Sequence, residues 1–154
     1  MAERKGVPAF DAVEDAVDAA TDSPEKAVIR QFFERWSARD LDGAFALTDP
    51  EGEWWHLTFG ETITIGEWEK RVRRNETLCG EPAVFTLGTM TQEGDRVSVL
   101  ATVTSTFLDG RIYWNQFHNL IRVRDGRIVW GREFSDPRRS DAAFSGRTGA
   151  FWRQ

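Results

Sequence analysis

Four β-forming segments in the second half of the chain are joined by three short connections that each contain glycine. The segments span 83–91, 96–107, 111–123 and 127–135, and the connections contain EGD, LDG and RDG. Glycine adopts the positive φ angles that tight turns require, and consecutive strands joined by such turns pair antiparallel. The pattern therefore predicts a four-stranded antiparallel meander, and the rest of the chain has to cover or extend that sheet.

The first half of the chain carries helix signals. Ser23 followed by Pro24 is typical of a helix start, and apolar residues at helical spacing then continue to about residue 38. A second, shorter helix is expected after Asp40. A short hairpin around Gly60 and a helix over 66–78 complete the layout. We predict an α+β fold in which helices pack on one face of a strongly curved, mostly antiparallel sheet.

Length and charge restrict the class of protein. The 154 residues suit one domain, and a net charge of −5 argues against a nucleic-acid binder that relies on a basic surface. No apolar run reaches the roughly 18 residues that span a membrane, and the polar N-terminus lacks the apolar core of a secretory signal. A cytoplasmic protein with neither a nucleic-acid nor a membrane partner is expected. We divide the chain into an N-terminal arm or short helix (1–22), a domain (23–140) and a C-terminal tail (141–154).

Motifs for metals and cofactors are missing from the sequence. Cys79 is the only cysteine, which excludes an internal disulfide and a cysteine zinc cluster. The two histidines, His56 and His118, have no recognisable ligand spacing. Glycine-rich phosphate loops, nucleophile elbows and dinucleotide fingerprints are also missing. We therefore expect no metal and no cofactor.

The strand at 111–123 mixes amides with aromatic residues on both of its faces, so the register of the last hairpin decides which groups share a face. A two-residue loop at 125–126 places His118 opposite Glu133, whereas a three-residue loop at 124–126 places Phe117 opposite Glu133. We favour the three-residue loop, because the shorter loop would force an aspartate to a positive φ angle.

With that loop, one face of the hairpin resembles a pocket wall and the other an interface. The predicted pocket face carries Tyr113, Asn115, Phe117, Asn119, Val129, Gly131, Glu133 and Ser135. The predicted outer face carries Trp114, Gln116, His118, Leu120, Arg122, Ile128, Trp130, Arg132 and Phe134. Buried amides and carboxylates without partners are costly, which favours a polar-lined cavity over a plain core. Two tryptophans and a phenylalanine on the outer face favour a homodimer through that face.

The helix pair ending in RDLDGAFAL, the following Trp/His strand and the segment DGRIYWNQFHNLIRVRDGRIVWGREFSDP resemble SnoaL-like members of the nuclear transport factor 2 superfamily. The resemblance covers about 23–140 and implies a cone-shaped α+β fold. The superfamily includes polyketide cyclases, ketosteroid isomerases, limonene epoxide hydrolases and phenazine biosynthesis A/B proteins. The resemblance therefore implies that acid-base chemistry on a small molecule is one function this chain could have.

The resemblance also suggests site residues. The general base of the ketosteroid isomerases falls on His56, their phenolic donor on Phe32 and their acidic donor near Asn119. A carboxylate of the epoxide hydrolases and of the phenazine-type proteins falls on Glu133. Phe32 lacks a hydroxyl group, and two further positions of the epoxide hydrolases fall on Leu100 and Thr102. Neither mechanism therefore transfers in its known form.

The sequence thus predicts a pocket for a small hydrophobic or aromatic carbonyl compound. Glu133 or His56 would move the proton, and Asn115 and Asn119 would orient the oxygen. The expected wall residues are Trp36, Trp55, Trp68, Tyr113, Phe117, Thr102 and Phe32. The alternative is a non-catalytic ligand-binding or accessory domain, in which Glu133 is held in an ion pair, for example with Arg71. Whether the chain is an enzyme stays open at this point.

Overall fold

The computed structural model describes residues 21–58 and 60–144. The helix predicted near the N-terminus and most of the predicted C-terminal tail lie outside these residues. Within them the chain order is α1 (Pro24–Ser37), α2 (Leu41–Phe45), β1 (Thr48–His56), β2 (Glu61–Thr64), α3 (Ile65–Glu76), β3 (Val84–Glu93), β4 (Arg96–Thr106), β5 (Ile112–Arg124), β6 (Arg127–Ser135) and α4 (Pro137–Phe144).

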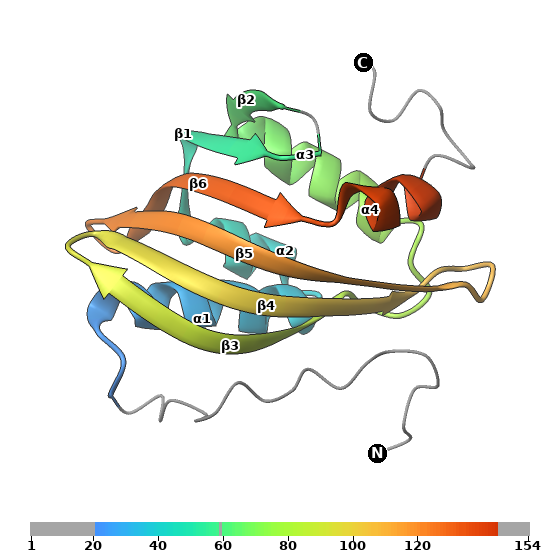
Figure 1. Cartoon of the computed structure of the whole chain (residues 1–154), viewed down its shortest axis with the longest axis horizontal. Coiled ribbons are helices and arrows are strands. Elements are labelled where there is room, and N and C mark those ends of the chain that lie inside the picture. The colour runs from blue at the N-terminus through green and yellow to red at the C-terminus, as the bar shows by residue number, and fades with distance from the viewer. Residues whose placement is uncertain (1–20, 59, 145–154) are drawn as a thin grey trace.

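The strands form one sheet in the order β2-β1-β6-β5-β4-β3. All neighbours pair antiparallel except β1 and β6, which are parallel. Figure 1 shows α1, α2 and α3 together on one face of the curved sheet, with α4 at the end of β6. The predicted α+β architecture is confirmed. No helix among the described residues is long and apolar enough to cross a membrane.

Local sequence signals set the helix starts. Ser23 caps α1, and its Oγ accepts a hydrogen bond from the Lys26 backbone N–H at 3.2 Å. Asp40 caps α2. Thr64 and Glu67 form a reciprocal capping box at the start of α3. The predicted caps of the first two helices are confirmed.

The last hairpin differs from the predicted register. Arg124 pairs with Arg127, so the loop has two residues, and Asp125 and Gly126 both take positive φ angles of 49° and 74°. The predicted three-residue loop is therefore wrong. These φ angles belong to a type I′ turn, whose twist matches that of the flanking strands.

A β-bulge follows this turn. Val123 pairs with Ile128 while Arg122 pairs with Trp130, so Val129 is an extra residue on β6. The bulge shifts the pairing by one residue, and Glu133 consequently lies opposite Asn119.

Because of the bulge, the two faces of the hairpin also differ from the predicted ones. Glu133 lies on the same face as Asn115 and Asn119, as predicted. Phe117, which was predicted to lie opposite Glu133, pairs with Ser135 instead. Ile128, predicted on the outer face, is fully buried opposite Val123.

Strand β1 begins at Thr48 and continues to His56. Its parallel pairing with β6 places His56 beside Glu133 and Trp54 beside Gly131. The C-terminal ends of β1 and β6 therefore bring an imidazole and a carboxylate together from positions far apart in the sequence.

The C-terminal helix α4 continues to Phe144, so the first four residues of the predicted tail are helical. Asn115 holds this helix: its Nδ2 donates to the Asp136 carbonyl oxygen at 3.1 Å and to Ser140 Oγ at 3.2 Å. The helix consequently lies against β5, where Ser140 and Phe144 reach the interior of the cone.

Candidate functional site

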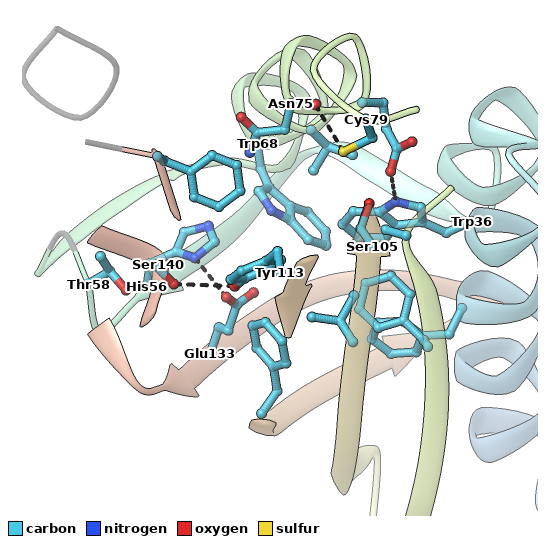
Figure 2. A pocket seen from close by; sticks show the side chains of 18 of the residues that line it. Trp36, His56, Thr58, Trp68, Asn75, Cys79, Ser105, Tyr113, Glu133 and Ser140 are labelled. Atoms are coloured by element: carbon cyan, nitrogen blue, oxygen red, sulfur yellow. Dashed lines mark hydrogen bonds and ion pairs between the residues drawn. The ribbon is translucent and has the colours of Figure 1, made fainter. Parts of the chain in front are cut away.

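A cavity of about 120 Å³ lies between the concave face of the sheet and the helices. Its wall is rich in aromatic residues, which include Trp36, Trp54, Trp68, Phe85 and Phe117. Figure 2 shows how side chains from strands and helices converge on this space. The volume is close to that of apolar protein cavities that hold one benzene ring, and below the 300 Å³ or more of drug-sized sites.

His56 and Glu133 form a pair at one end of the cavity. His56 Nδ1 lies 3.2 Å from Glu133 Oε1, and their side chains are only 11% and 15% exposed. The Trp54 indole N–H donates to Glu133 Oε2 at 3.4 Å. Glu133 is thus both open to the cavity and held by two neighbours. The alternative ion pair with Arg71 is wrong, because Arg71 binds Glu61 instead.

The pair has a clear chemical capability. A carboxylate that accepts a hydrogen bond from Nδ1 fixes the tautomer of a neutral imidazole and leaves the basic lone pair on Nε2. An imidazole and a carboxylate that share one hydrogen bond can take up and return a proton as a unit. The apolar wall strengthens electrostatic interactions of any charge that develops beside them.

Asn119 completes this end of the cavity. It lines the cavity, lies opposite Glu133 in the sheet and is 2% exposed. Among the described residues nothing donates a hydrogen bond to its Oδ1. A buried polar atom without a partner costs about 1–3 kcal/mol. A ligand group that donates a hydrogen bond to Oδ1 would remove this cost, and the amide N–H of the same side chain can donate to an oxygen.

Asn115 does not line the cavity. Its amide is used to hold α4, and its Nδ2 also donates to the Tyr113 hydroxyl at 3.2 Å. The structure therefore gives Asn115 contacts with protein groups, in place of the predicted contact with a substrate oxygen. Its effect on the cavity is to fix Tyr113 and α4.

Tyr113 lines the cavity, and its hydroxyl lies 3.4 Å from Ser140 Oγ. Burial raises the pKa of Tyr113 above its usual value, and its hydrogen bonds to Ser140 and Asn115 oppose that shift only in part. The phenol is therefore neutral at physiological pH and keeps a proton that it can donate.

The predicted wall residues divide into two groups. Trp36, Trp68, Tyr113 and Phe117 line the cavity. The expectation is wrong for three others, which lie elsewhere: Trp55, Thr102 and Phe32.

Strand alternation explains the first two errors. Trp55 lies between the inward Trp54 and His56, so it faces outward, with its ring 5.3 Å from that of Phe134. Thr102 pairs with Gln116 on the outer face, while the next residue, Val103, lines the cavity. Neither side chain can reach the site from its side of the sheet.

The prediction for Phe32 is wrong for a different reason. It is fully buried, and its ring contacts Phe33, Phe45 and Trp68 in the core behind the cavity wall. Phe33, one residue along α1, lines the cavity in its place.

Trp54 is a cavity residue that sequence reasoning missed. It is fully buried and stacks on Trp68, with 3.8 Å between ring centroids and an interplanar angle of 6°. The signal was available: if His56 faces inward on a strand, Trp54 must face inward too.

Metal ligation finds no support in the described residues, among which no group of three histidine, cysteine, aspartate or glutamate side chains could hold an ion.

Cys79 lines the cavity as a half-buried thiol, and its Sγ donates to the Asn75 carbonyl oxygen at 3.5 Å. Burial raises the pKa of Cys79, so this thiol is protonated at neutral pH.

Comparisons with known proteins agree with the fold. The model of the family described as SnoaL-like domain matches residues 29–130. The sequence finds no match among the curated proteins.

Solved structures give the same fold. AclR from Streptomyces galilaeus, a candidate hydroxylase, superposes with a TM-score of 0.68 at 17% identity, over 79% of this chain and 96% of that one. IdmH from Streptomyces antibioticus, a candidate polyketide cyclase, gives a TM-score of 0.67 at 21% identity, over 79% and 98%. An NTF2-like protein of unknown function from Burkholderia pseudomallei K96243 gives a TM-score of 0.66 at 24% identity, over 79% of this chain and 97% of that one. At these identities the likeness shows a shared fold.

Proposed function

The chain belongs to the SnoaL-like domain family, and from that premise we propose that its cavity is the active site of a cofactor-independent acid-base enzyme. The reaction would be of the isomerase, cyclase or lyase type, on a small hydrophobic or aromatic carbonyl compound. One observation carries the proposal: the His56–Glu133 pair and the buried Asn119 amide, which lies beside Glu133 on the adjacent strand, meet at one end of an aromatic cavity.

The proposed step is proton abstraction from the carbon next to the carbonyl group. The His56–Glu133 pair takes the proton, and the electron pair of the broken C–H bond moves into an enolate. The Asn119 amide N–H stabilises the enolate oxygen, because a fixed donor aimed at developing charge is most effective where water is excluded. Return of the proton to a different carbon, or attack of the enolate carbon on a second carbonyl, would give isomerisation or cyclisation.

The size of the cavity limits the substrate. A space of about 120 Å³ suits one substituted ring. The likeness in fold to IdmH, a candidate polyketide cyclase, is compatible with a carbonyl substrate. A polycyclic compound would require α4 to move, since Ser140 and Phe144 form part of the wall.

The test is deuterium exchange on a model ketone. Acetophenone is incubated with the protein in D₂O, and loss of the methyl proton signal is followed by NMR. We expect the wild type to accelerate exchange, and Glu133→Gln and His56→Ala each to lower the rate by roughly 10²-fold or more. Glu53→Gln is the matched control, because Glu53 lies on β1 with a 61% exposed side chain.

Exchange in the Glu133→Gln variant at the wild-type rate would contradict the assigned role. Circular dichroism of each variant shows whether it is folded, so that a loss of structure is not mistaken for a loss of chemistry.

A second function is favoured by one observation, the engagement of both Glu133 oxygens by protein donors. In a non-catalytic ligand-binding or accessory domain these bonds would only satisfy the oxygens of a buried carboxylate. Binding of the ketone by the wild type without any acceleration of exchange would support this function over the enzyme.

A further inference from the structure

A second polar cluster lies in the wall of the same cavity, away from the His56–Glu133 pair. Asn75 and Glu76 from the end of α3 belong to it, together with Cys79 and Ser105. Figure 2 shows Cys79, Ser105 and Trp36 on the opposite side of Trp68 from His56 and Glu133. The cavity therefore has two polar ends separated by an aromatic middle.

Glu76 is a buried carboxylate with few donors. Its side chain is 9% exposed, its Oε1 accepts the Trp36 indole N–H at 3.1 Å, and its Oε2 lies 3.6 Å from Arg39 Nε. No described residue donates a hydrogen bond to Oε2. Glu76 is also the last residue of α3, where the helix dipole disfavours negative charge. Each oxygen of a carboxyl group has more than one acceptor site, so Glu76 has acceptor capacity left.

Asn75 adds another acceptor. Within the described part of the chain, its buried Oδ1 receives no hydrogen bond. The nearby hydroxyl and thiol do not satisfy it, because Ser105 Oγ donates to the Glu81 carbonyl oxygen at 3.1 Å and Cys79 Sγ donates to the Asn75 carbonyl oxygen. This end of the cavity thus has unused acceptors, and its neighbouring donors are directed at the backbone.

The group that this end lacks is a hydrogen-bond donor. We propose that the cavity selects a single-ring carbonyl compound with a hydroxyl group across the ring, and that this hydroxyl donates its one hydrogen bond to the acceptor pair formed by Glu76 Oε2 and Asn75 Oδ1. The inference rests on the proposed function, which places the carbonyl group at Asn119. One ring fits the cavity volume, so the two polar ends would bind groups on opposite sides of the same ring. A hydroxyl-to-carboxylate hydrogen bond is among the stronger kinds in proteins.

The experiment measures binding of three ketones by calorimetry, on the whole chain. The ligands are 4-hydroxyacetophenone, acetophenone, and 4-methoxyacetophenone, which has an oxygen at the same place but no donor. We expect the hydroxyl compound to bind the wild type at least about tenfold more tightly than either of the others. Glu76→Gln should reduce this preference to about threefold or less.

Glu69→Gln is the matched control, since Glu69 is on the same helix, pairs with Arg73 and does not line the cavity. It should keep the full preference. If Glu76→Gln does not fold, the ligand series on the wild type still tests the proposal.

The outcomes separate the two proposals. Equal affinities of the wild type for all three ketones would overturn the inference about Glu76 and Asn75 and leave the proposed active site in place. A preference that is unchanged in Glu76→Gln would also overturn it. No binding of any of the three ketones would overturn both proposals.

Discussion

At the scale of single residues, Gly131 has a packing role that no other residue type can fill. It lies beneath Trp54, and a Cβ atom at this position would overlap the indole ring. The ring cannot move away, because it is fully buried and stacked on Trp68. The close approach of β6 to Trp54 therefore helps to place the indole N–H beside Glu133.

We predict that Gly131→Ala lowers the free energy of unfolding by about 1–3 kcal/mol, the usual cost of an overpacked core. Urea unfolding followed by tryptophan fluorescence measures it. Gly80→Ala is the control, because a Cβ there would meet its nearest atoms at an ordinary 3.7 Å. Equal stability of the two variants would mean that the indole can rearrange.

Cys79 gives a pH-dependent prediction. Burial raises the pKa of its thiol, so the thiol stays protonated up to a higher pH than a free cysteine does. Because the thiolate is the reactive form, alkylation by iodoacetamide should be slower than in urea-unfolded protein, and its rise with pH should be shifted upward. Mass spectrometry of the modified chain measures both rates. Equal rates in folded and unfolded protein would contradict the raised pKa.

At the scale of elements, the last hairpin shows what the sequence could and could not reveal. The four strands of the meander, their glycine turns and the caps of the first two helices follow from local chemistry, and the structure has these strands within two residues of their predicted bounds. The register does not follow, because the choice between loops of two and three residues depends on whether Asp125 accepts a positive φ angle. The register also depends on the bulge at Val129, which no local sequence pattern predicts.

The candidate site was predictable to a similar extent. Glu133 was predicted on the pocket face from the hairpin pattern, and the family resemblance assigned roles to Glu133 and His56. Their contact depends on the parallel pairing of β1 with β6, a long-range feature. Trp55 and Thr102 were misplaced because alternation along their strands was not applied to them. Asn75 and Glu76 gave no sequence signal, because a polar pair at a helix end usually faces solvent.

The turn itself can be tested through Asp125. Asparagine adopts positive φ angles more readily than aspartate does, and Asn-Gly is a preferred pair for type I′ turns. We predict that Asp125→Asn raises the free energy of unfolding by about 0.5 kcal/mol and that Asp125→Ala lowers it. Thermal unfolding measures both. Since both variants lose the same charge, equal stabilities would contradict the two-residue loop.

The attachment of α4 depends on Asn115. Leucine at this position would leave the Asp136 carbonyl oxygen and Ser140 Oγ without their present donor. We predict that Asn115→Leu loosens α4, at a cost of about 1–3 kcal/mol. Trypsin should then cleave after Arg138 and Arg139 several-fold faster than in the wild type.

Gln116→Leu is the control for this experiment, because Gln116 is the next residue on β5 and is exposed. Cleavage at the same rate in Asn115→Leu and in the control would show that α4 is held by its other contacts.

At the scale of the whole molecule, the sheet has two faces with different tasks. Inward residues of β5 and β6 line the cavity, and their outward neighbours form an exposed surface. Phe134 and Leu57 are 43% and 44% exposed there. Trp114 and His118 belong to the same side of the sheet and line a shallow surface hollow with Phe134. The predicted homodimer would cover this surface.

We predict that light scattering on the wild type gives twice the chain mass of 17.6 kDa, and that Phe134→Glu gives the single-chain mass. A carboxylate at the centre of an apolar interface would lose its hydration without gaining a partner, which disfavours association. Leu108→Glu is the control: Leu108 is 69% exposed but lies in the β4–β5 connection, away from this hollow. Because Glu133 precedes Phe134 and points to the opposite face, the monomeric variant should keep its ketone binding. A single-chain mass for the wild type at tens of micromolar would show that the outer face is not a dimer interface.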